Sequence, residues 1–271
     1  MNRTARKIIM IVVASVFAFS SAMVLKDYLQ MKSAAEFSES ISEMVVALAT
    51  EDHDYEMIDK DITDESAVVQ SEGSEDSTEK KSEDPPILVD FNLLCNQNQD
   101  IVAWLYCPDT PINYPIVQAA DNDFYLRRLL DGSYNTAGTL FMDFRNSEDF
   151  SDWNSIIYGH NMKNDSMFGT LPDYKAQSYF EEHSVMYLLT PEQNYKINLL
   201  AGFVTPASSK LYSVFNPDED EKTLLIDSWV AASNFDSGIN PASENHFITL
   251  STCSYEYSNA RYVLIGILEE S

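Results

Sequence analysis

Short β-prone runs separated by turn residues dominate the chain after residue 86. Two of these runs, 247–252 and 262–268, flank a polar loop near the end of the chain. The other six lie at residues 101–106, 112–117, 138–142, 155–158, 185–189 and 195–204. Turn-forming residues stand between many of them. Eight short strands predict a mainly β fold closed into a barrel, because closure removes exposed strand edges.

Two helices are predicted alongside these strands. Residues 87–96 have apolar side chains on one side of a helix, and they precede the first strand. Residues 219–232 also have helical spacing, with Leu224, Leu225, Trp229 and Val230 as the apolar positions. This second helix lies in the long loop before the strand that ends at Cys253.

Cys253 ends one strand of the last pair, and Arg261 begins the next. Both side chains are therefore expected to face one cleft. A guanidinium that cannot be deprotonated favours the thiolate form of a neighbouring cysteine, which is the nucleophilic form. The strand pair alone fits equally well with an inert, half-buried cysteine.

A histidine at the end of another predicted strand favours the reactive interpretation. The run 155–158 breaks at Gly159, and His160 follows directly. A histidine at a strand end can project into the cleft that holds Cys253. Cysteine with histidine is the usual pair for acyl transfer through a thioester.

Three motifs together resemble one family. They are Thr-Leu-Ser-Thr-Cys ending at Cys253, an arginine eight positions later, and Tyr-Gly-His-Asn-Met around His160. In this order they resemble class B sortases, which are membrane-anchored cysteine transpeptidases of Gram-positive bacteria. The resemblance runs from about residue 98 to 268. It implies an eight-stranded sortase-type β-barrel, with an N-terminal helix and a helix in the loop before the cysteine strand.

The resemblance also implies roles for single residues. The Cys253 thiolate attacks a threonine carbonyl in the C-terminal sorting signal of an exported protein, and His160 protonates the leaving amine. Arg261 holds the substrate and stabilises the oxyanion, and a peptidoglycan amine resolves the thioester. Further implied substrate contacts are Asn122, Leu126, Tyr212 and Ser251, although Leu126 fits a core position equally well.

Three other functions are compatible with parts of the pattern. A class B sortase that polymerises pilins uses a lysine side chain in place of the cell-wall amine. An L,D-transpeptidase also uses His, Cys and Arg, but its Ser-His-Gly motif is missing. A membrane-tethered binding module without catalysis leaves the placement of His160, Cys253 and Arg261 as coincidence.

The first residues predict a membrane anchor. An apolar run at residues 8–25 is about 18 residues long, or roughly 27 Å as a helix, which is enough to cross a hydrocarbon core. Arg3, Arg6 and Lys7 precede it, so a single-pass topology with the remainder of the chain outside the cell is expected. A cleaved signal peptide is the alternative, because Ser20, Ser21 and Ala22 are small. The expected organisation is an anchor or signal at 1–30, a stalk and acidic spacer at 31–86, and a catalytic domain at 87–271.

Composition excludes several function classes. The formal net charge of −26 argues against a nucleic-acid partner, and much of it lies in residues 51–84, which predict a disordered spacer. No HExxH motif or glycine-rich phosphate loop occurs, so neither a metal nor a cofactor is expected. Cys95 and Cys107 are open to two interpretations, a disulfide or two unpaired small apolar residues.

Overall fold

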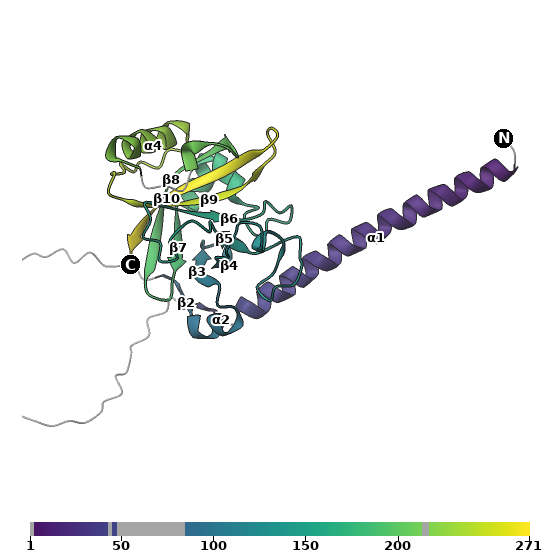
Figure 1. Cartoon of the computed structure of the whole chain (residues 1–271). Coiled ribbons are helices and arrows are strands. Elements are labelled where there is room, and N and C mark those ends of the chain that lie inside the picture. The colour runs from purple at the N-terminus through teal and green to yellow at the C-terminus, as the bar shows by residue number, and fades with distance from the viewer. Residues whose placement is uncertain (1–2, 43–44, 48–84, 213–216) are drawn as a thin grey trace, which may run out of the picture.

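A closed β-barrel forms the body of the molecule, and one long helix projects away from it (Figure 1). The structure is a computed structural model of the whole chain, and it describes residues 3–42, 45–47, 85–212 and 217–271. The predicted acidic spacer at 51–84 lies outside the described residues.

The barrel confirms the predicted mainly β fold and its eight strands. Around the ring the strand order is β10-β8-β7-β3-β4-β5-β6-β9, and β9 pairs with β10 to close it. Two neighbouring pairs, β4 with β5 and β6 with β9, are parallel, and the others are antiparallel. The strands are β3 (Ile101–Tyr106), β4 (Asn113–Val117), β5 (Leu140–Met142), β6 (Asn154–Tyr158), β7 (Val185–Leu189), β8 (Asn194–Pro206), β9 (His246–Ser254) and β10 (Ala260–Glu270).

Strand β10 is apolar on both faces, and each face is buried in a different cluster. Tyr262 and Leu264 point into the barrel interior, where they pack with Ile248 and Leu250 of β9. Val263 and Ile265 point outward into a second cluster. The near-continuous apolar run that predicted this strand is therefore explained by burial on both sides.

Helix α4 (Glu219–Ala232) covers the outer face of β8, β9 and β10, and its bounds match the predicted helix. The Asp218 carboxylate accepts a hydrogen bond from the backbone N–H of Glu221 and so caps the helix N-terminus. On the buried side, Trp229 stacks on Trp153 with ring centroids 5.4 Å apart. The Trp229 indole N–H also donates to the carbonyl of Leu211, which ties α4 to the turn beside it.

The predicted helix at 87–96 starts later than expected. Ile87–Val89 forms strand β2, which pairs with β1 (Val45–Ala47), and α2 (Phe91–Gln97) begins only after Asp90. The Asp90 carboxylate accepts from the N–H of Leu93 and fixes that start. The remaining elements are η1 (Tyr125–Arg127), η2 (Leu171–Lys175), α3 (Gln177–Glu182) and η3 (Lys210–Tyr212).

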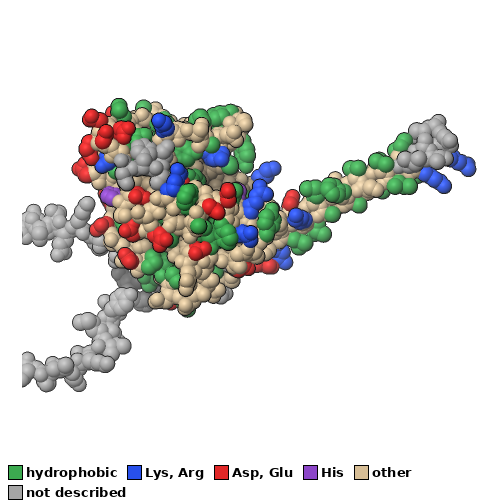
Figure 2. All heavy atoms as spheres, viewed as in Figure 1, with side chains coloured by type: hydrophobic (Ala, Val, Ile, Leu, Met, Phe, Trp, Pro, Cys, Tyr) green, Lys and Arg blue, Asp and Glu red, His purple; other side chains and the backbone are tan. Residues whose placement is uncertain are grey.

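Helix α1 (Arg3–Ser42) contains a stretch, Ile9–Ala34, that is long and apolar enough to cross a membrane. Figure 2 shows its apolar side chains on the surface of the projecting rod. The end of α1 lies against the barrel. Ile41 is 4% exposed in the cluster that also holds Trp104, and the carbonyl of Gln30 accepts from the Asn135 side chain at 2.9 Å.

Candidate functional site

Cys253 and Arg261 are direct partners across the antiparallel pair β9–β10. Paired residues on adjacent strands project to the same face of a sheet, so both side chains lie on one face. Val263, two residues after Arg261, belongs to the outer cluster under α4. Because side chains alternate along a strand, Cys253 and Arg261 belong to the outer face of the barrel.

His160 reaches this face from the neighbouring parallel strand. Tyr158 of β6 pairs with Ser251 of β9, two residues before the histidine and the cysteine. Hydrogen bonds between the two segments continue beyond Tyr158 and Ser251. The N–H of Gly159 donates to the carbonyl of Ser251 (3.1 Å), and the Asn161 amide donates to the carbonyl of Cys253 (2.8 Å). This register places the backbone of His160 next to that of Cys253, and Arg261 lies on the strand at the other side of Cys253.

All three side chains are half-buried. In the part of the chain that the structure describes, the Arg261 guanidinium forms no ion pair, and its NH1 donates to the carbonyl of Ala260 at 3.1 Å. The His160 ring, in contrast, is held: its Nε2 lies 2.7 Å from the carbonyl oxygen of Leu126.

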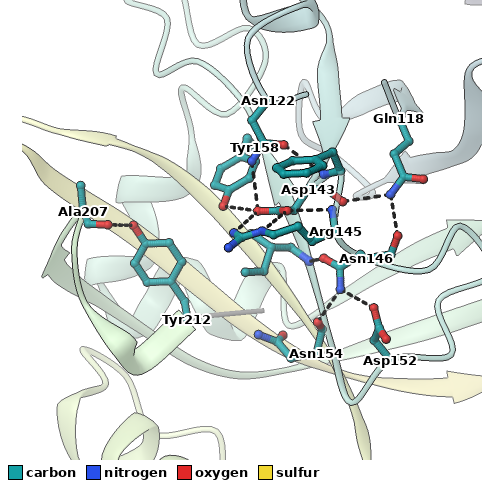
Figure 3. Close-up of polar contacts among 12 residues, drawn as sticks. Gln118, Asn122, Asp143, Arg145, Asn146, Asp152, Asn154, Tyr158, Ala207 and Tyr212 are labelled. Atoms are coloured by element: carbon teal, nitrogen blue, oxygen red, sulfur yellow. Dashed lines mark hydrogen bonds and ion pairs between the residues drawn. The ribbon is translucent and has the colours of Figure 1, made fainter. Parts of the chain in front are cut away.

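Tyr212 lies close enough to Arg261 and Cys253 for both residues to influence the pKa of its phenol. Burial raises the pKa of its phenol, the positive charge of Arg261 lowers it, and Cys253 raises it. Its hydroxyl donates to the carbonyl of Ala207 at 2.8 Å, so the ring is fixed at the end of η3 (Figure 3). The structure thus brings Tyr212 near Arg261 and Cys253, and the Leu126 carbonyl to His160.

A buried charge network lies on the other side of Tyr158 (Figure 3). The Asp143 carboxylate accepts two hydrogen bonds from the Arg145 guanidinium, at 2.8 and 2.7 Å, and one from the Tyr158 hydroxyl at 3.0 Å. The Asp143 side chain is 0% exposed, whereas that of Arg145 is 53% exposed. Burial raises the pKa of the Tyr158 phenol, and the neighbouring Asp143 charge raises it further, so the hydroxyl remains a donor.

Asn122 belongs to the Asp143 network and does not contact Cys253, Arg261 or His160 through a hydrogen bond in the described residues. Its amide nitrogen donates to Asp143 at 3.1 Å, and its amide oxygen accepts from the N–H of Phe144 at 3.0 Å. Ser251 is two residues before Cys253 on β9 and therefore belongs to the same face of the strand. It is 2% exposed, and its buried hydroxyl has no hydrogen-bond partner among the described residues. The Leu126 side chain is half-buried against the cluster of Trp104 and Tyr125.

The other reactive side chains lie elsewhere. Cys95 and Cys107 are both free, so the unpaired interpretation of these cysteines is confirmed. His183 ends α3 and packs on Tyr179, and His246 begins β9 with its Nδ1 3.1 Å from the carbonyl of Asp152. Within the described ranges, no group of three or more His, Cys, Asp or Glu side chains is placed to hold a metal ion.

Sequence reasoning missed the Asp143–Arg145 pair and the Leu126 carbonyl. The signal for the first was available: Asp143 directly follows an apolar strand, where an aspartate side chain commonly accepts from the backbone N–H two residues later and so brings Arg145 close. The second had no signal, because every residue carries a backbone carbonyl.

Curated relatives match most of the barrel domain. Sortase B of Listeria monocytogenes is 34% identical over 173 residues, which is 63% of this chain and 70% of that protein. Sortase B of Staphylococcus aureus is 31% identical over 169 residues, 62% of this chain and 69% of that protein. No protein-family model matches the chain.

Solved structures match the same region. A Staphylococcus aureus sortase B–substrate complex has a TM-score of 0.63 at 28% identity, covering 66% of this chain and 84% of that one. A sortase B complexed with triglycine has a TM-score of 0.62 at 30% identity, covering 66% and 85%. With a relative 34% identical along 70% of its length and the same closed barrel, this chain belongs to the class B sortase family of transpeptidases.

Proposed function

We propose that the chain cleaves a C-terminal sorting signal on exported proteins and joins them, through a thioester, to a cell-wall peptidoglycan amine. The observation that carries the proposal is the register of three neighbouring strand ends, which brings Cys253, Arg261 and His160 to one face. The solved relatives support it, since one sortase B structure is a substrate complex and another holds triglycine.

The chemistry assigns one task to each of the three residues. The Cys253 thiolate forms a bond to the carbonyl carbon of the scissile peptide, and the Arg261 guanidinium donates to the oxygen that becomes negative. His160 as imidazolium gives its proton to the departing amine, and the acyl group stays on sulfur. His160 then accepts a proton from the incoming amine as that amine displaces the thiolate.

Arg261 suits this task because its guanidinium has no carboxylate partner within the described residues. A neighbouring carboxylate would compete for its N–H donors. With NH1 on the carbonyl of Ala260, the other donors of the planar fork are available to a substrate oxygen.

The substrate is proposed to pass between Tyr212 and the turn that holds Leu126. The proximity of Tyr212 to Arg261 and Cys253 supports this path. Ser251 is proposed to donate its unpartnered hydroxyl, and Asn122 to contact the substrate at the edge of the Asp143 network. Both contacts require some movement, because Ser251 is buried and the Asn122 amide is already engaged.

The location proposed for the enzyme is the outer side of the cell membrane. Helix α1 supplies the single span, and the basic residues before it favour a cytoplasmic N-terminus. The proposed organisation is an anchor at 1–30, a stalk and acidic spacer at 31–86, and a catalytic domain at 87–271.

Turnover of a peptide library by the detergent-solubilised full chain tests the proposal. The chain is incubated with the peptides and with triglycine as acceptor, and mass spectrometry identifies the cleaved and joined products. Cys253→Ala is expected to reduce both products to background, while Cys95→Ala, at a free cysteine on α2, retains them. The acyl-enzyme is expected as a mass increase of wild type that hydroxylamine removes.

Cleavage by Cys253→Ala above background would contradict the nucleophile assignment. Joining to a lysine side chain in preference to triglycine would show pilin-type polymerisation in place of cell-wall anchoring.

A further inference from the structure

The His160 ring has a fixed hydrogen-bond partner that is neither Cys253 nor Arg261. Its Nε2 lies 2.7 Å from the carbonyl oxygen of Leu126, in the turn η1. A carbonyl oxygen only accepts, so Nε2 must carry the hydrogen. In the neutral ring the other nitrogen, Nδ1, is then the one that accepts a proton.

The turn that presents this carbonyl is fixed on both sides of Leu126. The Tyr125 hydroxyl donates to Asp100 at 2.6 Å, and the Tyr125 carbonyl accepts from the N–H of Thr139 at 3.1 Å. The Arg127 carbonyl accepts from the N–H of Asn135, also at 3.1 Å. Residues 135–139 therefore run alongside η1 and hold it by its backbone.

Gly138 is the point of closest approach between these two segments. A Cβ atom at Gly138 would lie 2.7 Å from the carbonyl oxygens of both Leu126 and Tyr125. Contacts that short do not occur for real side chains, and both neighbours are backbone atoms that cannot rotate away. Any side chain at this position must push the Leu126 carbonyl out of place.

We propose that Gly138 is a positioning residue for His160. By letting residues 135–139 pack directly on η1, it holds the Leu126 carbonyl where it selects the Nε2–H form of the imidazole. The inference rests on the proposed function in taking His160 as the general acid and base. The hydrogen bond and the ring form that it selects are defined by geometry alone.

Gly132 provides a matched control in the same segment. Both glycines have positive φ, +62° for Gly138 and +78° for Gly132, so alanine is strained at either position. A Cβ at Gly132 meets nothing within 4 Å. The difference between the two alanine variants therefore isolates displacement of the Leu126 carbonyl from backbone strain.

The first measurement is steady-state cleavage by the full chain in detergent. Gly138→Ala is expected to lower kcat by about a hundredfold, the usual effect of misplacing a catalytic group by about 1 Å. Its KM is expected to change less than its kcat, since Gly138 itself is buried behind the turn that borders the proposed substrate path. Gly132→Ala is expected to keep both constants within about twofold. Equal losses of kcat in the two variants would overturn the proposal.

The second measurement reads the ring directly and does not depend on turnover. ¹⁵N spectra of histidine-labelled chain are recorded at about pH 9, where an ordinary imidazole is neutral. The His160 signals are assigned from a His160→Gln spectrum. Wild type and Gly132→Ala are expected to show the Nε2–H form, and Gly138→Ala a mixture of the two forms.

An Nδ1–H form of His160 in wild type would overturn the proposal even if Gly138→Ala failed to fold. If the Nε2–H form is present but Cys253→Ala still cleaves peptides, then the proposed function fails while the positioning contact stands. Different results would therefore contradict the two proposals.

Discussion

Asp143 is a fully buried carboxylate that remains charged because its partners outweigh its burial. Burial raises the pKa of Asp143, but hydrogen bonds from Arg145, and from the neutral groups around it, lower that pKa below its ordinary value of 3.8. The charged carboxylate accepts the hydrogen bond of the Tyr158 hydroxyl, and Tyr158 lies between this network and the site. The network therefore stabilises one wall of the site.

Replacing Asp143 by asparagine is expected to destabilise the protein by about 2 kcal/mol at neutral pH. Breaking a buried pair costs about 3–5 kcal/mol, and the exposed half of Arg145 reduces that figure. A lowered folded-state pKa gives stability that is present above the unfolded value, near pH 4, and is lost as pH falls through the lower folded value. The gap between wild type and variant is therefore expected to close in acid.

Urea unfolding at about pH 7, 5 and 3, followed by tryptophan fluorescence, measures that gap. Asp123→Asn, at an exposed carboxylate two residues before Tyr125, serves as the control and is expected to change little at any pH. A gap that stays constant down to pH 3 would mean that Asp143 contributes through shape and not through charge.

At the scale of elements, helix α4 links the surface of the barrel to the site. Trp229 packs in the outer cluster and donates to the carbonyl of Leu211, the residue before Tyr212. Helix α4 therefore holds η3, the turn that ends at Tyr212, through Trp229.

Asp218→Ala is expected to lower stability by about 1 kcal/mol, because the first turn of α4 loses its side-chain cap. Asp218→Asn is expected to retain most of that energy, since an asparagine oxygen accepts the same hydrogen bond. Thermal unfolding of the three proteins makes the comparison, with a drop of roughly 2–4 °C expected for the alanine variant. Equal midpoints for alanine and asparagine would show that the cap contributes nothing.

The elements that the sequence predicted well are those with a local pattern. Strand β10 was predicted from its near-continuous apolar run, which burial on two faces explains, and helix α4 was predicted from its helical spacing. Strand β2 lies where the sequence predicted the start of a helix, because its partner β1 is about 40 residues earlier in the chain. Its three residues contain too little pattern to distinguish a strand from a helix.

The features of the site also divide into those with a local sequence pattern and those without one. Cys253, Arg261 and His160 were placed by their positions at strand ends, and the strand pairings put those ends side by side. The parallel pairing of β6 with β9 is not visible in the sequence, because it depends on how the whole ring closes. The contact between Leu126 and His160 was also hidden, since it uses only the backbone of Leu126.

At the scale of the whole molecule, α1 is part of the folded body as well as a candidate span. Its exposed apolar stretch ends near Ala34, and Ile41, about two turns later, is buried against the barrel. In the proposed membrane-anchored arrangement, a continuous helix therefore sets the distance between the membrane and the barrel.

Ile41→Ala is expected to destabilise the body by about 2 kcal/mol, near the lower end of the range for truncating a buried isoleucine, because this edge of the core can relax. For a domain of this size the thermal midpoint should fall by roughly 4–8 °C. Phe17→Ala, at a side chain 74% exposed on the projecting part of α1, is the control and should leave the midpoint unchanged. An unchanged midpoint for Ile41→Ala would show that α1 does not stay docked in solution.

The pairing of β1 with β2 determines which segments of this protein can tolerate insertions and deletions. Ala47 lies opposite Ile87, so the chain leaves the body and re-enters it at points about 5 Å apart. The number of residues between Ala47 and Ile87 therefore does not change where Ile87 lies relative to Ala47. Insertions, deletions and changes of charge between Ala47 and Ile87 are therefore expected to leave the position of the barrel relative to α1 unchanged, whereas a single residue inserted in α1 between Ala34 and Ile41 would rotate the barrel by about 100° around the helix axis.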